Sequence, residues 1–369
     1  MFTRDHFAKL FLSIGMLALP VVASAAGDIC YLRDAAAPSV NSMYLLCGQA
    51  IVYSTADAGG HWTMNRMVKA ADVRASSTMT ADQRAQLILG ATPELHAISF
   101  SDDSHGIVVG NSGTIFTTAD AGKTWTQRQD AKKQNYTTEH LVAVFAVGNQ
   151  AWASGFYGTM LHSSDGGATW EKQVTGTTMD LQGLYFINQD LGWAVGWSGT
   201  ILRTADGGKN WKIIASDSAT WSLNTVFFKD EKNGWACGFA GELLGSTDGG
   251  LTWKTLKSPI QNGLSSIKLD KSGRLWIAAD DSLLLSEDGG ATWSAVSVGE
   301  HANVFMIKVF GKDNSLWALG ELGLMHEAGT SKEWKPVDNF HPAGTYIADS
   351  LEEMSDQATP ASPNAPAAR

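Results

Sequence analysis

The sequence has no cluster of lysine or arginine. It contains 27 lysines and arginines against 37 aspartates and glutamates, which gives a formal net charge of −10 at pH 7. Proteins that bind nucleic acid or adsorb to anionic lipid need a concentrated basic surface. We therefore expect neither nucleic acid nor a lipid surface as a partner.

Motifs for catalysis and metal binding are also missing. No HExxH, phosphate-binding loop, nucleophile elbow or paired CxxC occurs. His96, His140 and His301 are isolated from one another in the sequence, and isolated histidines are poor material for a metal site. We expect no metal and no cofactor.

The apolar run from Leu10 to Val22 is too short to span a bilayer. Arg4 and Lys9 precede it, and the small residues 23–26 follow it, which is the pattern of a cleaved signal peptide over residues 1–25. Ile29 directly before Cys30 argues against a lipid anchor. We expect a monomeric protein exported to the periplasm, or secreted as the alternative, without insertion into the membrane.

One short phrase occurs six times: a serine or threonine, an aspartate, one or two glycines and a tryptophan. A seventh, eroded copy ends at Trp334. From the second tryptophan onward the copies are 45, 41, 42, 40 and 41 residues apart, the period of four-stranded propeller blades. The aspartates are Asp57, Asp120, Asp165, Asp206, Asp248 and Asp288, and the tryptophans are Trp62, Trp125, Trp170, Trp211, Trp253 and Trp293.

The residues before each phrase read as three short strands. In the fourth repeat these are 181–186, 192–196 and 199–204, and a fourth strand starts at Trp211. Corresponding repeats begin near Ile29, Leu95, Leu141, Leu181, Leu223, Leu264 and Val304. This pattern predicts an all-β, seven-bladed propeller over residues 28–337, with four antiparallel strands per blade.

The repeated aspartate phrase falls on the hairpin between strands three and four. A carboxylate at the start of a tight turn accepts hydrogen bonds from backbone N–H groups, and the glycines supply positive φ. Six aspartates on six separate hairpins do not converge on one site. We interpret them as structural residues.

These repeats resemble the Asp-box, or BNR, repeats of the Ycf48/Hcf136 family. The resemblance rests on the S/T-x-D-x-G-x-T-W phrases and on the preceding phrases Gly192–Gly196, Gly199–Leu202 and Gly234–Gly238. That family comprises seven-bladed propellers known as photosystem II stability and assembly factors, with relatives in non-photosynthetic bacteria. The resemblance implies a non-enzymatic scaffold that binds a membrane-protein complex or its subunits.

Two departures from the repeat fall on the face opposite the Asp boxes, where the hairpins between strands two and three meet the linkers between blades. The first is an insertion over residues 68–90, in which residues 80–89 are predicted to be helical. The second is a set of aromatic residues on consecutive hairpin tips and one linker. Either these rings form an exposed recognition patch, or they fold onto neighbouring loops. They are Phe156, Tyr157, Trp197, Trp221 and Phe239.

Three cysteines occur, at positions 30, 47 and 237. Cys30 and Cys47 fall in neighbouring predicted strands, where a disulfide is sterically possible, while Cys47 and Cys237 share a repeat position that also suits a buried free thiol. After blade seven we expect a C-terminal extension over residues 338–354, which helps to close the ring, and a disordered Ala/Pro tail over residues 355–369.

The alternative function is that of a glycoside hydrolase. Asp boxes also occur in sialidases, but none of the arginines lies in the Arg-Ile-Pro phrase that a sialidase site needs. Other glycosidases need two facing carboxylates roughly 5–10 Å apart. The candidates for that pair are Glu94, Glu139, Asp180 and Glu300, which precede inner strands. The scaffold role is favoured, in a photosystem or in another envelope complex such as a transporter.

Overall fold

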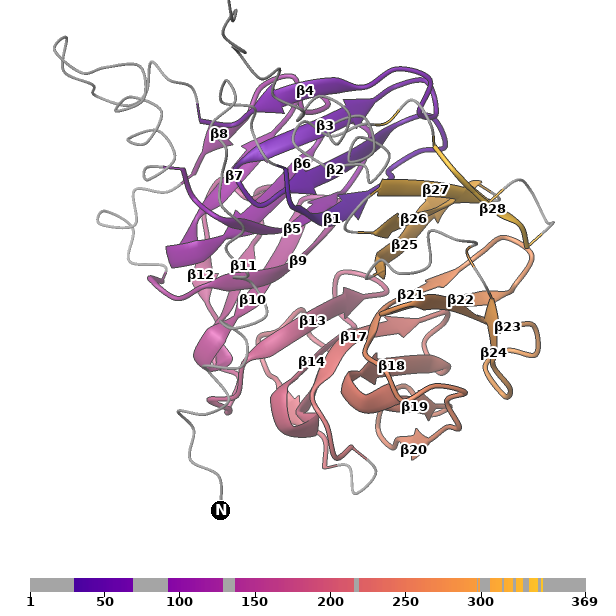
Figure 1. The fold of residues 1–369 in the computed structure, drawn as a ribbon. Coiled ribbons are helices and arrows are strands. Elements are labelled where there is room, and N and C mark those ends of the chain that lie inside the picture. Colours follow the sequence, from indigo (N-terminus) through magenta and orange to yellow (C-terminus); the bar gives the residue numbers. More distant parts are fainter. Residues whose placement is uncertain are drawn as a thin grey trace, which may run out of the picture.

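The computed structural model describes residues 30–68, 92–128, 137–215, 219–296, 298, 306–313, 315–320, 323–327, 332–337 and 340. These residues form seven four-stranded sheets, each built from strands consecutive in sequence (Figure 1). The predicted all-β seven-bladed propeller is confirmed. The predicted signal peptide, the helical insertion beyond residue 68, and the C-terminal extension and tail apart from Phe340 lie outside the described residues. Within the described ranges, no helix is both long and apolar enough to cross a membrane.

Blade one contains β1 (Leu32–Ala36), β2 (Met43–Cys47), β3 (Ile51–Thr55) and β4 (Thr63–Arg66). Blade two contains β5 (Leu95–Phe100), β6 (Gly106–Gly110), β7 (Ile115–Thr118) and β8 (Thr126–Gln127). Blade three contains β9 (Leu141–Val147), β10 (Gln150–Gly155), β11 (Met160–Ser163) and β12 (Glu171–Lys172). Blade four contains β13 (Leu181–Phe186), β14 (Gly192–Gly196), β15 (Ile201–Thr204) and β16 (Lys212–Ile213).

Blade five contains β17 (Leu223–Phe228), β18 (Gly234–Gly238), β19 (Leu243–Ser246) and β20 (Lys254–Thr255). Blade six contains β21 (Leu264–Leu269), β22 (Leu275–Ala279), β23 (Ser282–Ser286) and β24 (Ser294–Val296). Blade seven contains β25 (Met306–Lys312), β26 (Ser315–Gly320), β27 (Gly323–Glu327) and β28 (Trp334–Pro336). Each first strand contacts the first strand of the next blade, and β25 contacts β1, so the ring is closed.

Aromatic rings join neighbouring blades. The Trp193 ring of blade four stacks on Phe228 of blade five with centroids 3.5 Å apart, and Phe228 meets the edge of Trp253 at 5.7 Å. Gly234 pairs with Phe228 in the sheet, and a Cβ there would lie 2.5 Å from the phenyl ring. Glycine therefore precedes the second-strand tryptophan because the ring occupies its side-chain space. Equivalent three-ring stacks involve Trp152, Phe186 and Trp211, and Tyr44, Phe100 and Trp125.

The first strands of neighbouring blades are also linked by hydrogen bonds. The Ser266 hydroxyl of blade six accepts from the backbone N–H of Val309 at 2.8 Å, and the Asn224 amide donates to the carbonyl of Leu264 at 2.9 Å. Between blades one and two, Asp34 accepts from the backbone N–H of Ile98 at 2.9 Å. These bonds fix the blades close to the axis.

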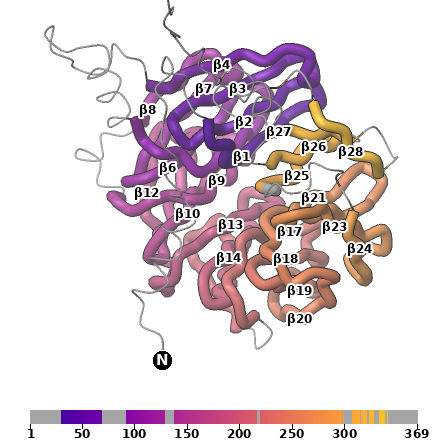
Figure 2. Tube along the Cα trace, in the orientation of Figure 1, coloured from indigo at the N-terminus to yellow at the C-terminus, as the bar shows by residue number. Residues whose placement is uncertain are grey.

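Blades one and seven meet at the seam of the ring, where the first and last parts of the chain lie side by side (Figures 1 and 2). Among the described residues no strand is shared between these two blades, and side chains join them. One apolar cluster joins residues of both blades, including Leu45 and Trp317. Phe340 packs against the Tyr53 and Trp62 rings of blade one. Cys30 and Cys47 form a disulfide inside this cluster, and Cys237 is a buried free thiol.

Blade seven replaces the Asp box with an ion network. Glu327 stands where the other blades have the serine or threonine of the box, at the end of the third strand, and its side chain is fully buried. Arg274 of blade six donates to Glu327 at 2.9 Å and to Asp270 at 2.6 Å. Burial raises the pKa of Glu327, although Arg274 opposes this effect. In blade seven the position of the box hydroxyl is thus taken by a carboxylate that joins blades six and seven.

Candidate protein-binding face

Six Asp boxes occupy the connections between third and fourth strands. In blade three, Asp165 Oδ1 accepts from the backbone N–H of Thr169 at 2.8 Å, and Asp165 Oδ2 accepts from the Thr169 hydroxyl at 2.6 Å. The Ser163 hydroxyl donates to Asp165 and accepts from the backbone N–H of Gly167. Asp120, Asp248 and Asp288 repeat this pattern with threonine; Asp206 uses Asn210, and Asp57 uses His61.

The boxes also accept hydrogen bonds from the neighbouring blade. The indole N–H of Trp152 in blade three donates to the carbonyl of Gly207 in the box of blade four, and Trp193 donates in the same way to Gly249 in blade five. Most box tryptophans are themselves buried or half-buried. The carboxylates accept hydrogen bonds within their own turns, and the box glycines accept hydrogen bonds from the adjacent blade. The boxes therefore have a structural role.

Acid is expected to weaken these turns. Hydrogen bonds from Thr292, and a further one from Ser286, lower the pKa of Asp288 from 3.8 to about 2. A carboxyl whose pKa is lower in the folded chain stabilises it fully above the unfolded value and loses that contribution as the pH falls through the folded value. We therefore expect the free energy of unfolding to fall between about pH 4 and pH 2. Urea titrations at stepped pH measure this, and the fall should be smaller in Asp288→Asn. An equal fall in both proteins would contradict the assignment.

The opposite face carries the hairpins between second and third strands together with the linkers between blades; we call it the linker face. In blades two to five each hairpin tip is a short 3-10 turn with its middle residue in the left-handed region. The turns are η2 (Asn111–Gly113), η3 (Phe156–Gly158), η4 (Trp197–Gly199) and η5 (Phe239–Gly241). A Cβ at Gly158 would lie 2.0 Å from the carbonyl oxygen of Thr177, so the tip of blade three lies directly on the next linker.

Two carboxylates hold the tips in place. Asp180 Oδ1 accepts from the backbone N–H of Tyr157 at 2.8 Å, and the carbonyl of Asp180 accepts from the N–H of Trp197 at 3.0 Å. Glu242 Oε2 accepts from the backbone N–H of Trp221 at 3.2 Å and from the Thr220 hydroxyl at 3.0 Å. The tips of blades three to five are thereby fixed as one surface.

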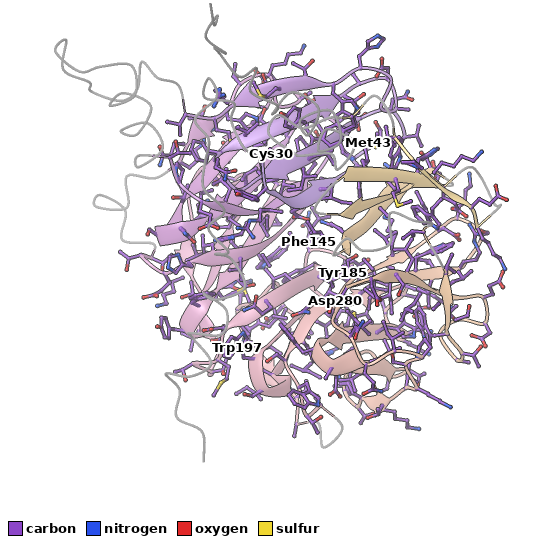
Figure 3. All side chains as sticks on the ribbon, viewed as in Figure 1. Cys30, Met43, Phe145, Tyr185, Trp197 and Asp280 are labelled. Atoms are coloured by element: carbon purple, nitrogen blue, oxygen red, sulfur yellow. A yellow bond between two sulfur atoms is a disulfide. The ribbon has the colours of Figure 1, made fainter. Side chains whose placement is uncertain are left out.

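The five predicted aromatic residues lie on this surface and differ in exposure. Tyr157, Trp221 and Phe239 are 63%, 54% and 36% exposed. Phe156 and Trp197 are half-buried, and the Phe156 ring meets His140 edge-on at 5.2 Å. Trp197 lies at the edge of the molecule, whereas Phe145 and Tyr185 of the inner strands lie near its centre (Figure 3). Three of the five rings are therefore exposed and two are half-buried, and their role in recognition stays a prediction. We call the five residues the aromatic surface.

Sequence reasoning missed two neighbours of the aromatic surface. Met179, which is 38% exposed, directly precedes Asp180, and Ile213 is 57% exposed at the end of blade four. The only sequence signal for Met179 is its place in the linker between two aromatic tips. Both residues enlarge the apolar area over blades three to five.

Tyr157 has a left-handed backbone, with φ of 56°, which is costly for a bulky residue. Asparagine adopts this conformation more readily. Because the ring is mostly exposed, we expect Tyr157→Asn to leave the free energy of unfolding unchanged or to raise it by up to about 1 kcal/mol. Chemical denaturation measures this. The matched control is Tyr157→Val, which should lose about 1 kcal/mol or more, because β-branched residues suit this region worst. An equal loss in both variants would contradict the account.

The first strands carry a β-bulge residue at equivalent positions: Arg33, His96, Val142, Gln182, Asn224 and Ser265. In blade seven the sequence pattern puts Phe305 in this set, and the register corrects this to Ile307, which lies in the bulge between Met306 and Lys308. His96 Nε2 lies 2.6 Å from Asn111 Oδ1, and burial lowers the pKa of His96. No group of three potential metal ligands occurs among the described residues, from which His301 is absent.

Two of the candidate glycosidase carboxylates take part in structural contacts. Glu94 forms an ion pair with Arg33 at 2.9 Å and accepts from the side chain of Asn111. Asp180 holds Tyr157, as described above. Glu300 lies outside the described residues.

Comparison with known proteins places the chain in a family. The family model for "Photosynthesis system II assembly factor YCF48" matches residues 75–180 and 173–261, which together span 187 of 369 residues. The chain belongs to the YCF48 family. The sequence-based resemblance is therefore confirmed.

Individual proteins resemble this YCF48-family chain over a short segment or at low sequence identity. The "Photosystem II assembly lipoprotein Ycf48" of Synechococcus sp. (strain CC9902) is 32% identical over 84 residues, which cover 22% of this chain and 24% of that protein. A solved structure of YCF48 bound to D1 peptide has a TM-score of 0.62 at 19% identity, covering 85% of this chain and 98% of that one. A GH74 enzyme of Niastella koreensis has a TM-score of 0.56 at 16% identity, covering 83% and 44%. At such identities the likeness to solved structures concerns the fold alone.

Proposed function

We propose that this chain is an exported, non-enzymatic assembly factor that binds a segment of a membrane-protein subunit on its linker face. Membership of the YCF48 family supports the role, and the solved YCF48 relative with a bound D1 peptide gives a precedent for a peptide ligand. The aromatic surface supports this location of the binding site, because Tyr157, Trp221 and Phe239 are exposed there. Exposed aromatic anchors are the side chains that dominate binding energy at protein interfaces.

We propose that this chain, unlike the Synechococcus relative named as a lipoprotein, has no lipid at Cys30. The Sγ atom of Cys30 is bonded to Cys47, so this cysteine carries no lipid. We propose that the protein acts in the periplasm as a monomer, since its ring is closed by its own blades. Identification of the bound subunit distinguishes a photosystem from another envelope complex.

Complementation tests the function. A strain lacking the gene receives the wild-type chain, Trp197→Ala/Phe239→Ala, or the control Leu251→Ala, whose residue is 55% exposed in the Asp box of blade five, on the other face. We expect the strain to lose a membrane complex on native gels, the wild type and Leu251→Ala to restore it, and the double variant to restore less than about a tenth. An unchanged complex in the deletion strain, or full restoration by a normally folded double variant, would refute the proposal.

An enzymatic assay tests the absence of catalysis. Purified protein is incubated with sialosides and polysaccharides, and reducing sugar is measured. We expect no release above the buffer blank. Release by the wild type that is lost in Asp180→Asn would establish a glycosidase and overturn the proposed role.

A further inference from the structure

Carboxylates alternate with the aromatic tips across blades three to five. Asp180 binds the backbone of Tyr157 and of Trp197, so it lies between those two tips. Glu242 directly follows the turn of Phe239 and binds the backbone of Trp221. The order along the surface is therefore aromatic, acid, aromatic, aromatic, acid, aromatic.

These carboxylates have no cation of their own among the described residues, where no ion pair involves Asp180 or Glu242. Glu242 is only 8% exposed. The hydrogen bonds described above use one oxygen of each carboxylate, Oδ1 of Asp180 and Oε2 of Glu242. A buried carboxylate is costly without a compensating positive charge, so each site favours an incoming cation.

The sequence of this region likewise contains aromatic and acidic residues without basic ones. The tips of blades three to five and the two linkers between these blades comprise residues 155–158, 173–180, 196–199, 214–222 and 238–242. These segments contain five aromatic residues and three acids, and no lysine, arginine or histidine. The faces of tyrosine and tryptophan rings attract ammonium and guanidinium groups, and a nearby carboxylate adds to that attraction.

We infer that this part of the linker face selects a partner segment in which lysine or arginine side chains stand next to apolar residues. The inference rests on the proposed function, because it names the chemistry of the segment that the aromatic surface binds. The apolar residues pack on Trp221, Phe239 and Met179, and the basic groups enter beside Asp180 and Glu242. Arginine is the better fit, because its guanidinium group both stacks on rings and pairs with carboxylates.

Three synthetic peptides test this selectivity by calorimetry. They share one pattern of leucines with, between them, arginine in the first, glutamine in the second and glutamate in the third. We expect the arginine peptide to bind the full chain at least about tenfold more tightly than the glutamine peptide, and the glutamate peptide to bind most weakly. Raising the salt concentration from about 0.05 to 0.5 M should weaken only the arginine peptide.

Isosteric variants test the residues. Asp180→Asn/Glu242→Gln keeps the oxygens that accept the tip N–H groups, so the fold should persist, as an unchanged Tm would verify. We expect the preference for arginine over glutamine to drop below about threefold in this variant, and to stay unchanged in the control Leu251→Ala. Equal affinity for all three peptides, no binding of the arginine peptide, or an undiminished preference in the double variant would overturn the inference. These outcomes leave the proposed function standing, because complementation by the aromatic variants decides that separately.

Discussion

Replacing Arg274 with alanine is expected to lower the free energy of unfolding by about 3–5 kcal/mol. The guanidinium group bridges Asp270 and Glu327, whose side chains are 1% and 0% exposed, and is itself 10% exposed. Its removal leaves two buried carboxylates without a cation at the contact between blades six and seven. Asp270 retains hydrogen bonds from Ser272 and Trp276, whereas Glu327 retains, among the residues that the structure describes, the backbone N–H of Lys332.

Chemical denaturation at neutral pH measures this loss. The matched control is Arg33→Ala, since Arg33 pairs with Glu94 where both side chains are nearly half exposed. An exposed pair contributes about 0–1 kcal/mol. A loss in Arg274→Ala no greater than that in Arg33→Ala would contradict the assigned network. A second variant, Arg274→Met/Glu327→Ser, should recover part of the loss, because it removes one of the two buried carboxylates and restores the hydroxyl of the other six boxes, while Asp270 keeps its hydrogen bonds from Ser272 and Trp276.

Loss of the disulfide between Cys30 and Cys47 should be nearly as costly. The bond closes a loop with a sequence separation of 17, for which the loss of unfolded-state entropy corresponds to about 3 kcal/mol. Both cysteines are buried in the cluster that joins blade one to blade seven. Because the described residues include no sheet shared by these two blades, we expect this cluster to hold the seam. We expect Cys30→Ser/Cys47→Ser to lose about 2–5 kcal/mol.

A reductant separates the disulfide from the substitution itself. Dithiothreitol should lower the unfolding midpoint of the wild type and leave that of the double serine variant unchanged. Cys237→Ser serves as the control for a buried cysteine outside the seam, and its midpoint should still fall with reductant. A wild-type midpoint that does not respond to reductant would contradict the role given to the bond.

The fold was predictable from the sequence because each blade repeats its contacts. The glycine before Trp193 leaves space for a phenylalanine ring, and a glycine carbonyl of the box accepts from the tryptophan of the preceding blade, so both contacts repeat regularly in the sequence. Those marks fade in blade seven. There Glu327 replaces the box hydroxyl, and the sequence pattern puts Phe305 where the register of the sheet puts Ile307.

The candidate site was predictable in position but not in chemistry. Strand alternation puts Phe156 and Tyr157 on a hairpin tip, yet only the structure separates the exposed Tyr157 from Phe156, whose ring lies against His140 of the preceding linker. The roles of Asp180 and Glu242 depend on contacts between segments about 20 residues apart in sequence. Such contacts leave no local pattern, so no periodicity reveals them.

Site-specific photo-crosslinking in the native envelope tests the central claim most directly. A benzophenone side chain replaces Tyr157 on the linker face or Leu251 on the Asp-box face, two residues of similar exposure, 63% and 55%. The proposed function predicts that position 157 captures one membrane-protein subunit, identified by mass spectrometry, and that position 251 does not. Capture of that subunit from position 251 alone, or equally from both positions, would contradict it.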